Sequence, residues 1–273
     1  MKTVDIRELE KRARNVRISI IQEVYNAKSG HPGGALSCAD ILTALYFSQM
    51  NIHPEEPDSP SRDRFILSKG HASAALYAVL AERGYFDKKE LTSFRNINSM
   101  LQGHPDMKKV PGVDMTTGSL GQGLSCANGM AMASKLNSDG FRVYCLLGDG
   151  EIEEGQVWEA AMTASYYKLD NLCVIVDNNN LQIDGQVSDV MSPYPIDEKF
   201  KSFGFETIII DGHNFKDILE ALNKARNTKK KPTAIIAKTI KGKGVSFMEN
   251  QVGWHGKAPN EEEFKKAMEE LCQ

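Results

Sequence analysis

The amino-acid sequence predicts an α/β fold in which a parallel sheet is covered by helices on both faces. Segments with helical periodicity alternate with short apolar runs along nearly all of the 273 residues. Runs such as VYCLL and NLCVIV contain almost no charged residues, as expected for strands that are buried on both faces. Glycine-rich loops follow several of these runs, and ligands of parallel sheets bind at the carboxyl ends of the strands.

The first third of the chain predicts two helices, a strand and a third helix. Residues 5–28 form the first helix, because apolar residues recur there at steps of three and four. These residues are Ile6, Leu9, Ala13, Val16, Ile20 and Val24. The stretch SGHPGG breaks that helix over residues 29–34, and a second helix is expected from about Cys38 to Met50. A proline-rich loop follows, then the short strand RFILS, and KGHAS turns into a helix that ends near Arg83.

The remainder repeats the alternation of helix and strand. Residues 99–123 are rich in glycine and are expected to be irregular. After them we expect the helix GLSCANGMAMASKL, the strand FRVYCLLGDG, a helix carrying Trp158 and the strand NLCVIVDNNN. The strand ETIIIDGHN, the helix NFKDILEALNKARN, the strand PTAIIAKTI and a peripheral amphipathic helix complete the chain. No linker divides these elements, so residues 1–273 are expected to form one domain.

Composition excludes several classes of protein. The 33 basic and 36 acidic side chains nearly balance, so the chain has no strong net electrostatic field that would indicate binding to nucleic acid or to a membrane surface. Five cysteines occur without a C-x-x-C spacing, and four of them have apolar surroundings typical of buried free thiols. A charged amino-terminal segment and the lack of a long apolar run then predict a cytoplasmic protein without a signal peptide.

Two neighbouring strand ends predict a metal and diphosphate site. Asp149 stands between Gly148 and Gly150, and these glycines allow a sharp turn and a close approach to a ligand. After 27 intervening residues, the next apolar strand ends in three asparagines at 178–180. Carboxylate and amide oxygens at one point suit Mg²⁺ or Ca²⁺ and leave positions for phosphate oxygens. The helix that follows Gly150 is expected to direct its amino end toward the same anion.

Four of the six histidines lie in glycine-rich loops, which predicts a shared cleft. They are His31 in SGHPGG, His71 in SKGHAS, His104 in QGHPD and His255 in GWHGKAP. Histidine can donate hydrogen bonds to phosphate or hydroxyl oxygens and can exchange protons near neutral pH. A zinc cluster is the alternative, but the loops lack paired cysteines and no H-x-x-x-H helix occurs.

These segments, in this order, resemble the diphosphate-binding half of transketolases, which are thiamine-diphosphate enzymes. SGHPGG, LSKGHAS, QGHPD, TTGSLGQG, GDGEIEEGQVWEA, DNNNLQIDG and GWHGKAP carry the resemblance. It implies that thiamine diphosphate is held through Mg²⁺, for which Ca²⁺ or Mn²⁺ can substitute. The implied metal ligands are the side chains of Asp149 and Asn179 and the backbone carbonyl of Leu181. Asn179 is preferred to Asn178 because of its distance from the IDG turn at 183–185.

The same resemblance implies roles for other residues. His71 and His255 would touch the diphosphate and the reacting carbons, and Gly150 would let the backbone approach the diphosphate. Gly118 and Leu120 would pack beside the cofactor rings. His31 and His104 would bond sugar hydroxyls, so these four histidines are the candidate catalytic residues. Glu154 would join a carboxylate network at the subunit interface, although a solvated acid in the first helical turn is the alternative.

The resemblance also implies that catalysis needs a second chain. The printed sequence ends at Gln273, so the pyrimidine-binding half of a transketolase is expected on a separate subunit, in an A₂B₂ assembly. The reaction would pass a two-carbon ketol unit from a ketose phosphate to an aldose phosphate. Lys241 and Lys243 could steer such an anion or form a solvated turn. The alternatives are a deoxyxylulose-phosphate synthase, the alpha subunit of a 2-oxo-acid dehydrogenase, or a non-catalytic regulatory subunit.

Overall fold

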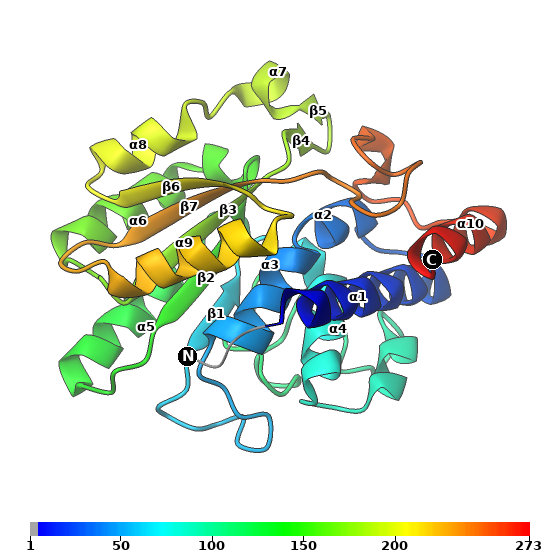
Figure 1. Cartoon of the computed structure of the whole chain (residues 1–273), viewed down its shortest axis with the longest axis horizontal. Coiled ribbons are helices and arrows are strands. Elements are labelled where there is room, and N and C mark those ends of the chain that lie inside the picture. The colour runs from blue at the N-terminus through cyan, green and yellow to red at the C-terminus, as the bar shows by residue number, and fades with distance from the viewer. Residues whose placement is uncertain (1–4) are drawn as a thin grey trace.

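The structure, a computed structural model, describes residues 5–273 and contains a five-stranded sheet in the order β1-β2-β3-β7-β6 (Figure 1). Every neighbouring pair in this sheet is parallel. The strands are β1 (Arg64–Leu67), β2 (Val143–Gly148), β3 (Leu172–Asn178), β6 (Glu206–Asp211) and β7 (Thr233–Lys238). A separate antiparallel hairpin pairs β4 (Leu181–Gln182) with β5 (Gly185–Gln186). The parallel sheet confirms the predicted fold class.

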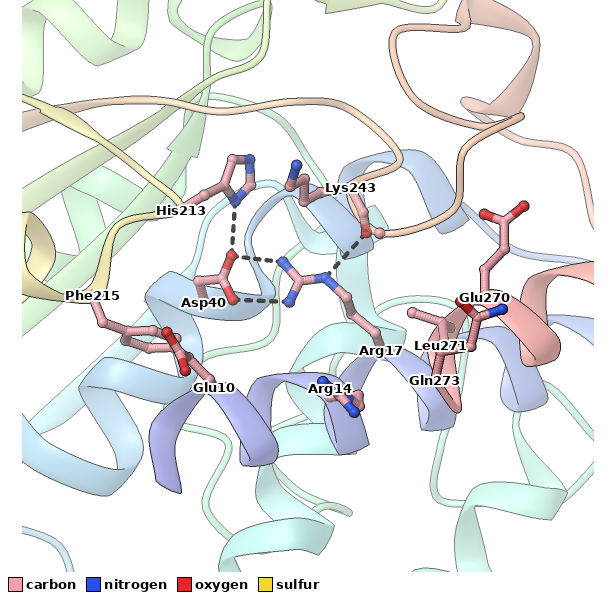
Figure 2. Close-up of a pocket in the computed structure, with 11 residues that line it drawn as sticks. Glu10, Arg14, Arg17, Asp40, His213, Phe215, Lys243, Glu270, Leu271 and Gln273 are labelled. Atoms are coloured by element: carbon pink, nitrogen blue, oxygen red, sulfur yellow. Dashed lines mark hydrogen bonds and ion pairs between the residues drawn. The ribbon is translucent and has the colours of Figure 1, made fainter. Parts of the chain in front are cut away.

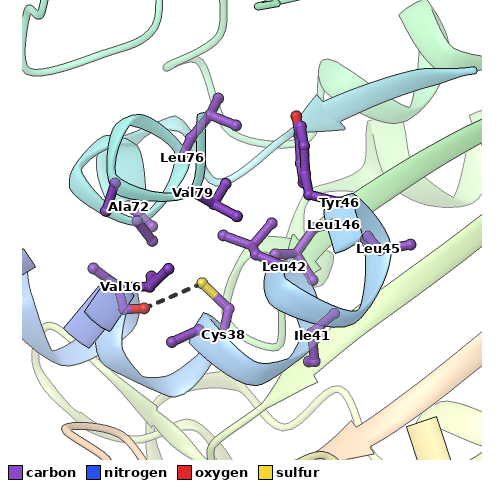
Figure 3. Packing of buried hydrophobic residues seen from close by; sticks show 14 of the residues in the cluster. Val16, Cys38, Ile41, Leu42, Leu45, Tyr46, Ala72, Leu76, Val79 and Leu146 are labelled. Atoms are coloured by element: carbon purple, nitrogen blue, oxygen red, sulfur yellow. Dashed lines mark hydrogen bonds between the residues drawn. The ribbon is translucent and has the colours of Figure 1, made fainter. Parts of the chain in front are cut away.

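One face of the sheet belongs to a buried cluster that is completed by helices from both ends of the chain. They are α1 (Ile6–Ala27), α2 (Pro32–Ser37), α3 (Ala39–Ala44), α4 (Ser73–Arg83), α9 (Phe215–Asn227) and α10 (Glu261–Leu271). Their apolar side chains form one buried cluster with the strands, and Figure 3 shows Val16, Leu42 and Val79 converging with Leu146 of β2. Five of the six periodic apolar residues predicted for 5–28, from Leu9 to Val24, bury α1 against this cluster, whereas Ile6 at the start of the helix is exposed.

The opposite face is covered by α5 (Gly123–Asn137), α6 (Gly155–Tyr166) and α8 (Ile196–Ser202) (Figure 1). Successive side chains of a strand point to opposite faces, so Leu146 joins the first cluster and Cys145 joins the second. Ile175 and Val174 of β3 divide in the same way. Burial on both faces explains why these strands are continuous apolar runs without alternation.

Several short elements differ from the prediction. The break after α1 is shorter than residues 29–34, because Pro32 begins α2; proline is well accepted at the first helical position, where no backbone donor is needed. Within the predicted second helix, α3 is continued by a π-helical turn at Leu45–Gln49. The short helix α7 (Val187–Met191) and α8 were not predicted. Short 3₁₀ turns also occur at Gly70–Ala72, Lys88–Ser93, Glu151–Glu153 and Val252–Trp254.

The cysteines are free, but fewer are buried than the sequence suggested. Cys38, Cys145 and Cys173 are buried, whereas Cys126 on α5 is half-buried and Cys272, beyond the end of α10, is exposed. Burial raises the pKa of the Cys38 thiol to about 11, which makes it unreactive near neutral pH. Over residues 5–273, no helix has the length and the apolar character that crossing a membrane requires.

A buried polar network ties α1 and α3 to the segment that follows β7 (Figure 2). Asp40 of α3 accepts hydrogen bonds from both terminal nitrogens of Arg17, at 2.8 and 2.6 Å, and from Nδ1 of His213 at 2.8 Å. The backbone N–H of Ile240 donates to Nε2 of His213 at 2.9 Å, and Nε of Arg17 donates to the carbonyl of Lys243 at 3.1 Å. Both ends of residues 240–243 are thereby fixed.

Candidate functional site

The loops after β1, β2, β3 and β7 surround a cavity of about 280 Å³ at the carboxyl edge of the sheet. The register explains their meeting, because Gly148 at the end of β2 pairs with Asp177 of β3, and Asn178 pairs with Lys238 of β7. The α1–α2 loop and the 252–256 segment complete the wall. The lining residues include His31, Gly34, Lys69, His71, Gly118, Leu120, Asp149, Gly150, Asn179, Lys241 and His255.

Asp149 is buried at the tip of β2 and is held by three donors. Its Oδ2 accepts from Nδ2 of Asn178 at 3.0 Å and from the backbone N–H of Asn180 at 2.5 Å. Its Oδ1 accepts from the backbone N–H of Gly150 at 3.0 Å. Burial and the charge of Asp177 nevertheless raise the pKa of the Asp149 carboxyl to about 6. Among residues 5–273 no lysine or arginine forms a direct ion pair with this carboxylate, and the charges of Lys69 and Lys241 act on it only at longer range.

The other two oxygen donors expected from the sequence lie close to this carboxylate. Asn179 lines the cavity, and its Oδ1 accepts from the backbone N–H of Leu181 at 3.1 Å. The carbonyl of Leu181 in turn accepts from Nζ of Lys241, a residue of the same cavity, at 3.0 Å. Asn178 lines a different cavity, so the structure favours Asn179 over Asn178 as the residue that faces the site.

Lys69 of the cavity wall and Asp177 form a buried ion pair that sequence reasoning missed. Nζ of Lys69 donates to Oδ2 of Asp177 and, at 2.8 Å, to the carbonyl of Gly34. The hydroxyls of Ser37 and Thr239 also donate to Asp177. Burial opposes ionisation of Asp177, but Lys69 and these donors hold its pKa below the usual range. Lys69 lies in the KGHAS segment, 108 residues from Asp177, and no local pattern marks it as buried.

Lys241 is a second ammonium group in the cavity wall and is nearly inaccessible to solvent. Its Nζ donates to the Leu181 carbonyl and lies 2.9 Å from Nδ1 of His255. Burial and the charge of Lys69 lower the pKa of Lys241 to about 8. The sequence had suggested a solvated basic turn as one interpretation of Lys241 and Lys243; for Lys241 that alternative is wrong, because the Lys241 side chain is buried and the network around Asp40 fixes the turn.

Three of the four loop histidines converge. The ring centroids of His31, His71 and His255 lie 5.2 to 5.6 Å apart and form a triangle on one side of the cavity. Burial and neighbouring positive charges lower the pKa of His31 to about 4, of His71 to about 2 and of His255 to about 3. All three are therefore neutral near pH 7 and can present an N–H donor or a lone pair.

His104 and Glu154 are exposed and lie outside the cavity wall. The ring of His104 packs against Gly118. A Cβ atom added to Gly118 would lie 3.0 Å from Cδ2 of His104. Gly118 and Leu120 do line the cavity, and Leu120 is exposed enough to meet a ligand or another chain. Glu154 precedes α6 and packs beside Gly121. A 3₁₀ turn separates Gly150 from α6, so the helix amino end starts farther from Gly150 than the sequence suggested.

Glu151 is a further residue that sequence reasoning did not single out. Its buried carboxylate accepts from Oγ of Ser68 at 2.5 Å, from the backbone N–H of Gly121 at 3.0 Å and from that of Gly148 at 3.0 Å. These bonds join the loops after β1 and β2 to the TTGSLGQG segment. Glu151 therefore fixes the mutual position of three loops that line the cavity. Only long-range contacts reveal this role, which is why no local pattern predicted it.

The donor set fits a divalent cation with an anionic ligand. One carboxylate, one amide and one carbonyl oxygen, from Asp149, Asn179 and Leu181, are the hard ligands that Mg²⁺ and Ca²⁺ prefer. Among residues 5–273, no three histidine, cysteine or acidic side chains gather as a metal site, so a zinc cluster has no support. A Cβ atom added to Gly34 would lie 3.8 Å from both Nε2 of His71 and Nζ of Lys69, in ordinary van der Waals contact, so Gly34 packs directly beside these two nitrogens.

Comparison with known proteins identifies related chains over almost the full length. The family model described as the thiamine diphosphate binding domain of transketolase matches residues 9–272. The chain is 41% identical over 270 residues to a named subunit of apulose-4-phosphate transketolase from Phocaeicola vulgatus, covering 99% of this chain and 96% of that protein. It is 43% identical over 264 residues to 6-deoxy-6-sulfo-D-fructose transketolase subunit SqwG from a Clostridium species, covering 97% and 96%.

Longer transketolases match with one part of their chains. Human transketolase is 45% identical over 256 residues, which cover 92% of this chain and 40% of that protein. The crystal structure of transketolase from Campylobacter jejuni superposes with a TM-score of 0.92 and 38% identity, covering 98% of this chain and 43% of that chain. The chain thus spans about two fifths of the length of these longer relatives and nearly the whole length of the two subunits.

Proposed function

Because this chain belongs to the family of transketolase domains that bind thiamine diphosphate, we propose that it is the diphosphate-binding subunit of a two-subunit transketolase. A partner chain would supply the pyrimidine-binding half of each site, in an A₂B₂ assembly. The observation that carries this proposal is the match over 96% of the length of relatives that are themselves named as subunits. We propose further that residues 1–273 form one domain, because both buried clusters rest on the same sheet.

The oxygen donors at the tips of β2 and β3 are the proposed metal ligands. Asp149 and Asn179 would bind Mg²⁺ through their side chains, and Leu181 would bind it through its carbonyl. When bound, thiamine diphosphate supplies the nucleophilic carbon that carries the two-carbon unit. The metal and the ammonium group of Lys241 would neutralise its diphosphate, and Gly150 would allow the backbone to approach it. Gly118 and Leu120 would pack beside the cofactor rings.

The neutral histidines are proposed to stabilise, through their N–H groups, oxygen atoms of the substrate that gain negative charge. An ammonium group can only donate, so the contact between Lys241 and Nδ1 of His255 requires the ring proton to reside on Nε2. His255 can then donate to an oxygen that gains negative charge during ketol transfer, and the adjacent His71 ring would do the same. His31 and His104 would bind sugar hydroxyls. Glu154 would contact another subunit, for which its exposed position is suitable.

The proposed reaction transfers a two-carbon ketol unit from a ketose or ketose phosphate donor to an aldose or aldose phosphate acceptor. Relatives are named for apulose 4-phosphate and for 6-deoxy-6-sulfo-D-fructose, each a sugar with an anionic group. Neither nucleic acid nor a membrane is proposed as a partner, because the basic and acidic side chains nearly balance. A cytoplasmic location is proposed because the five free cysteines suit a reducing compartment.

The test uses this chain with and without its partner subunit. We expect ketol transfer from a ketose phosphate only when both subunits, thiamine diphosphate and Mg²⁺ are present, and calorimetry should show Mg²⁺-dependent binding of thiamine diphosphate. Asp149→Asn should weaken that binding by more than about tenfold, since a charged metal ligand is lost. Asp139→Asn, in an exposed loop, is the matched control. Full activity of the chain alone would refute the two-subunit proposal, and turnover of pyruvate in place of ketoses would refute the substrate class.

A further inference from the structure

Arg95 lies beside the histidine triangle and has no role in the proposed mechanism. Its Nη1 donates to Oγ of Ser29 at 2.9 Å, and its Nη2 lies 3.4 Å from Nδ1 of His31. The backbone of Arg95 has a φ of 60°, a left-handed conformation that is unfavourable for a non-glycine residue. Its N–H donates to the carbonyl of Leu101 at 2.7 Å, which closes the loop and offsets part of that cost. Strain of this kind concentrates at functional sites.

The guanidinium of Arg95 also packs closely against the loop that carries His104. A Cβ atom added to Gly103 would lie 2.9 Å from Cζ and 2.9 Å from Nη2 of Arg95, so only glycine admits the guanidinium at this distance. Gly103 directly precedes His104, and Ser29 is two residues before His31. One side chain therefore connects the two loops whose histidines are proposed to bind the sugar hydroxyls.

The contact with Arg95 determines the tautomer of His31. A guanidinium has five N–H donors and no acceptor, so Nδ1 of His31 must accept, and the ring proton must reside on Nε2. His31 lines the cavity, and Nε2–H is the donor that it can offer to a ligand. Burial, then the charges of Arg95, His104 and Lys241, lower the pKa of His31 to about 4 and keep the ring neutral.

We propose that Arg95 is a positioning residue that holds His31 in the Nε2–H tautomer and fixes the His31 and His104 loops for recognition of the sugar hydroxyls. The inference rests on the proposed function, because it assigns the hydroxyl-binding side of that same site. Arg95 itself need not touch the substrate. It acts through His31, whose second nitrogen it occupies, and through Gly103, against which it packs.

Kinetics of the complete two-subunit enzyme test this role with three variants. Arg95→Gln removes the positive charge. Arg95→Lys keeps the charge but loses the planar guanidinium group with its five N–H donors. Gly103→Ala displaces the guanidinium without changing any charge. We expect each to lower kcat/KM for the ketose donor by about 10- to 100-fold, with thiamine diphosphate affinity changed less than about twofold. Arg7→Gln, an exposed arginine at the start of α1, is the control and should behave like the wild type.

The pH dependence of kcat/KM distinguishes a positioning role of Arg95 from a general loss of structure. The groups that face His31 are Arg95, His104, Lys241 and the rings of His71 and His255. Removing the charge in Arg95→Gln should raise the pKa of His31 and move the acid limb of kcat/KM to higher pH. Arg95→Lys and Gly103→Ala should leave that limb in place, because each keeps a positive charge near the ring.

Nitrogen-15 NMR of this chain gives a readout that does not need activity. We expect the wild-type ring of His31, assigned with His31→Gln, to be protonated at Nε2 alone, and Arg95→Gln to show both tautomers. An unchanged tautomer in Arg95→Gln, or kcat/KM within twofold of wild type in both Arg95→Gln and Gly103→Ala, would overturn the proposal. A parallel loss of cofactor affinity would also overturn it. If the wild-type enzyme transfers no ketol unit, the proposed function fails, while the NMR result still decides the role of Arg95.

Discussion

Replacing Asp40 with asparagine should destabilise the chain by an amount that depends on pH. Burial alone would raise the pKa of the Asp40 carboxyl, but Arg17 and His213 outweigh it and lower the pKa to about 2, from 3.8 in an unfolded chain. A depressed pKa contributes stability that is present above the unfolded value and is lost as the pH falls through the folded value. The difference corresponds to on the order of 2 kcal/mol at pH 7 and to about half of that near pH 3.

Asp40→Asn also leaves the buried guanidinium of Arg17 without its carboxylate, and breaking such a pair costs about 3–5 kcal/mol in other proteins. We therefore expect the free energy of unfolding at pH 7, measured by urea unfolding followed by circular dichroism, to fall by about 2–4 kcal/mol. The difference in this free energy between wild type and Asp40→Asn should decrease by about 1 kcal/mol between pH 5 and pH 3. Asp139→Asn, which is exposed, is the control. A cost below about 0.5 kcal/mol at pH 7, or a gap independent of pH, would refute this account of the network.

The remaining predictions concern glycines and a helix cap. In Gly70→Ala the new Cβ would lie 2.7 Å from Oγ1 of Thr117 and 2.9 Å from the backbone nitrogen of Gly118. We therefore expect the free energy of unfolding, measured in urea, to fall by about 1–3 kcal/mol. Calorimetry should show thiamine diphosphate binding weakened at least tenfold. Gly129→Ala, on the exposed face of α5 with open space around it, should instead add up to about 1 kcal/mol; destabilisation there would contradict the geometry. Asn260→Ala removes the capping box of α10 and should cost about 1 kcal/mol in urea without altering cofactor affinity.

The larger elements of the fold could be predicted because local signals agree with the tertiary structure. In α1 the apolar periodicity coincides with the buried face, and β2 and β3 are apolar throughout because both faces are covered. The short helices α7 and α8 could not be predicted in the same way. Each has fewer than two full turns of regular pattern, and packing of Ile196 and Phe200 against the second cluster, rather than local propensity, stabilises α8.

The site was predictable where its chemistry depends on adjacent residues. Asp149 between two glycines, and asparagines at the end of the next strand, were sufficient to locate one edge of the cavity. Lys69 and Glu151 were missed because their partners lie far away in the sequence, 108 residues in the case of Asp177 and 83 in that of Ser68. A lone charged residue in a loop gives no local sign that it is buried, and the partner that makes its burial possible is defined only by the fold.

The cavity contains a buried acid, Asp149, and a buried base, Lys241, that form no direct ion pair with each other. Lys69 is neutralised by Asp177, whereas within residues 5–273 the near neighbours of Lys241 are a carbonyl and a neutral histidine. Asp149, likewise, is surrounded by neutral donors. Burying unpaired charges destabilises a fold, so both groups weaken the chain by itself. A divalent cation beside Asp149 and a diphosphate beside Lys241 would compensate both charges at once, and neither ligand alone would compensate both. The opposite signs of these two buried groups are those that the proposed joint binding of metal and diphosphate would compensate.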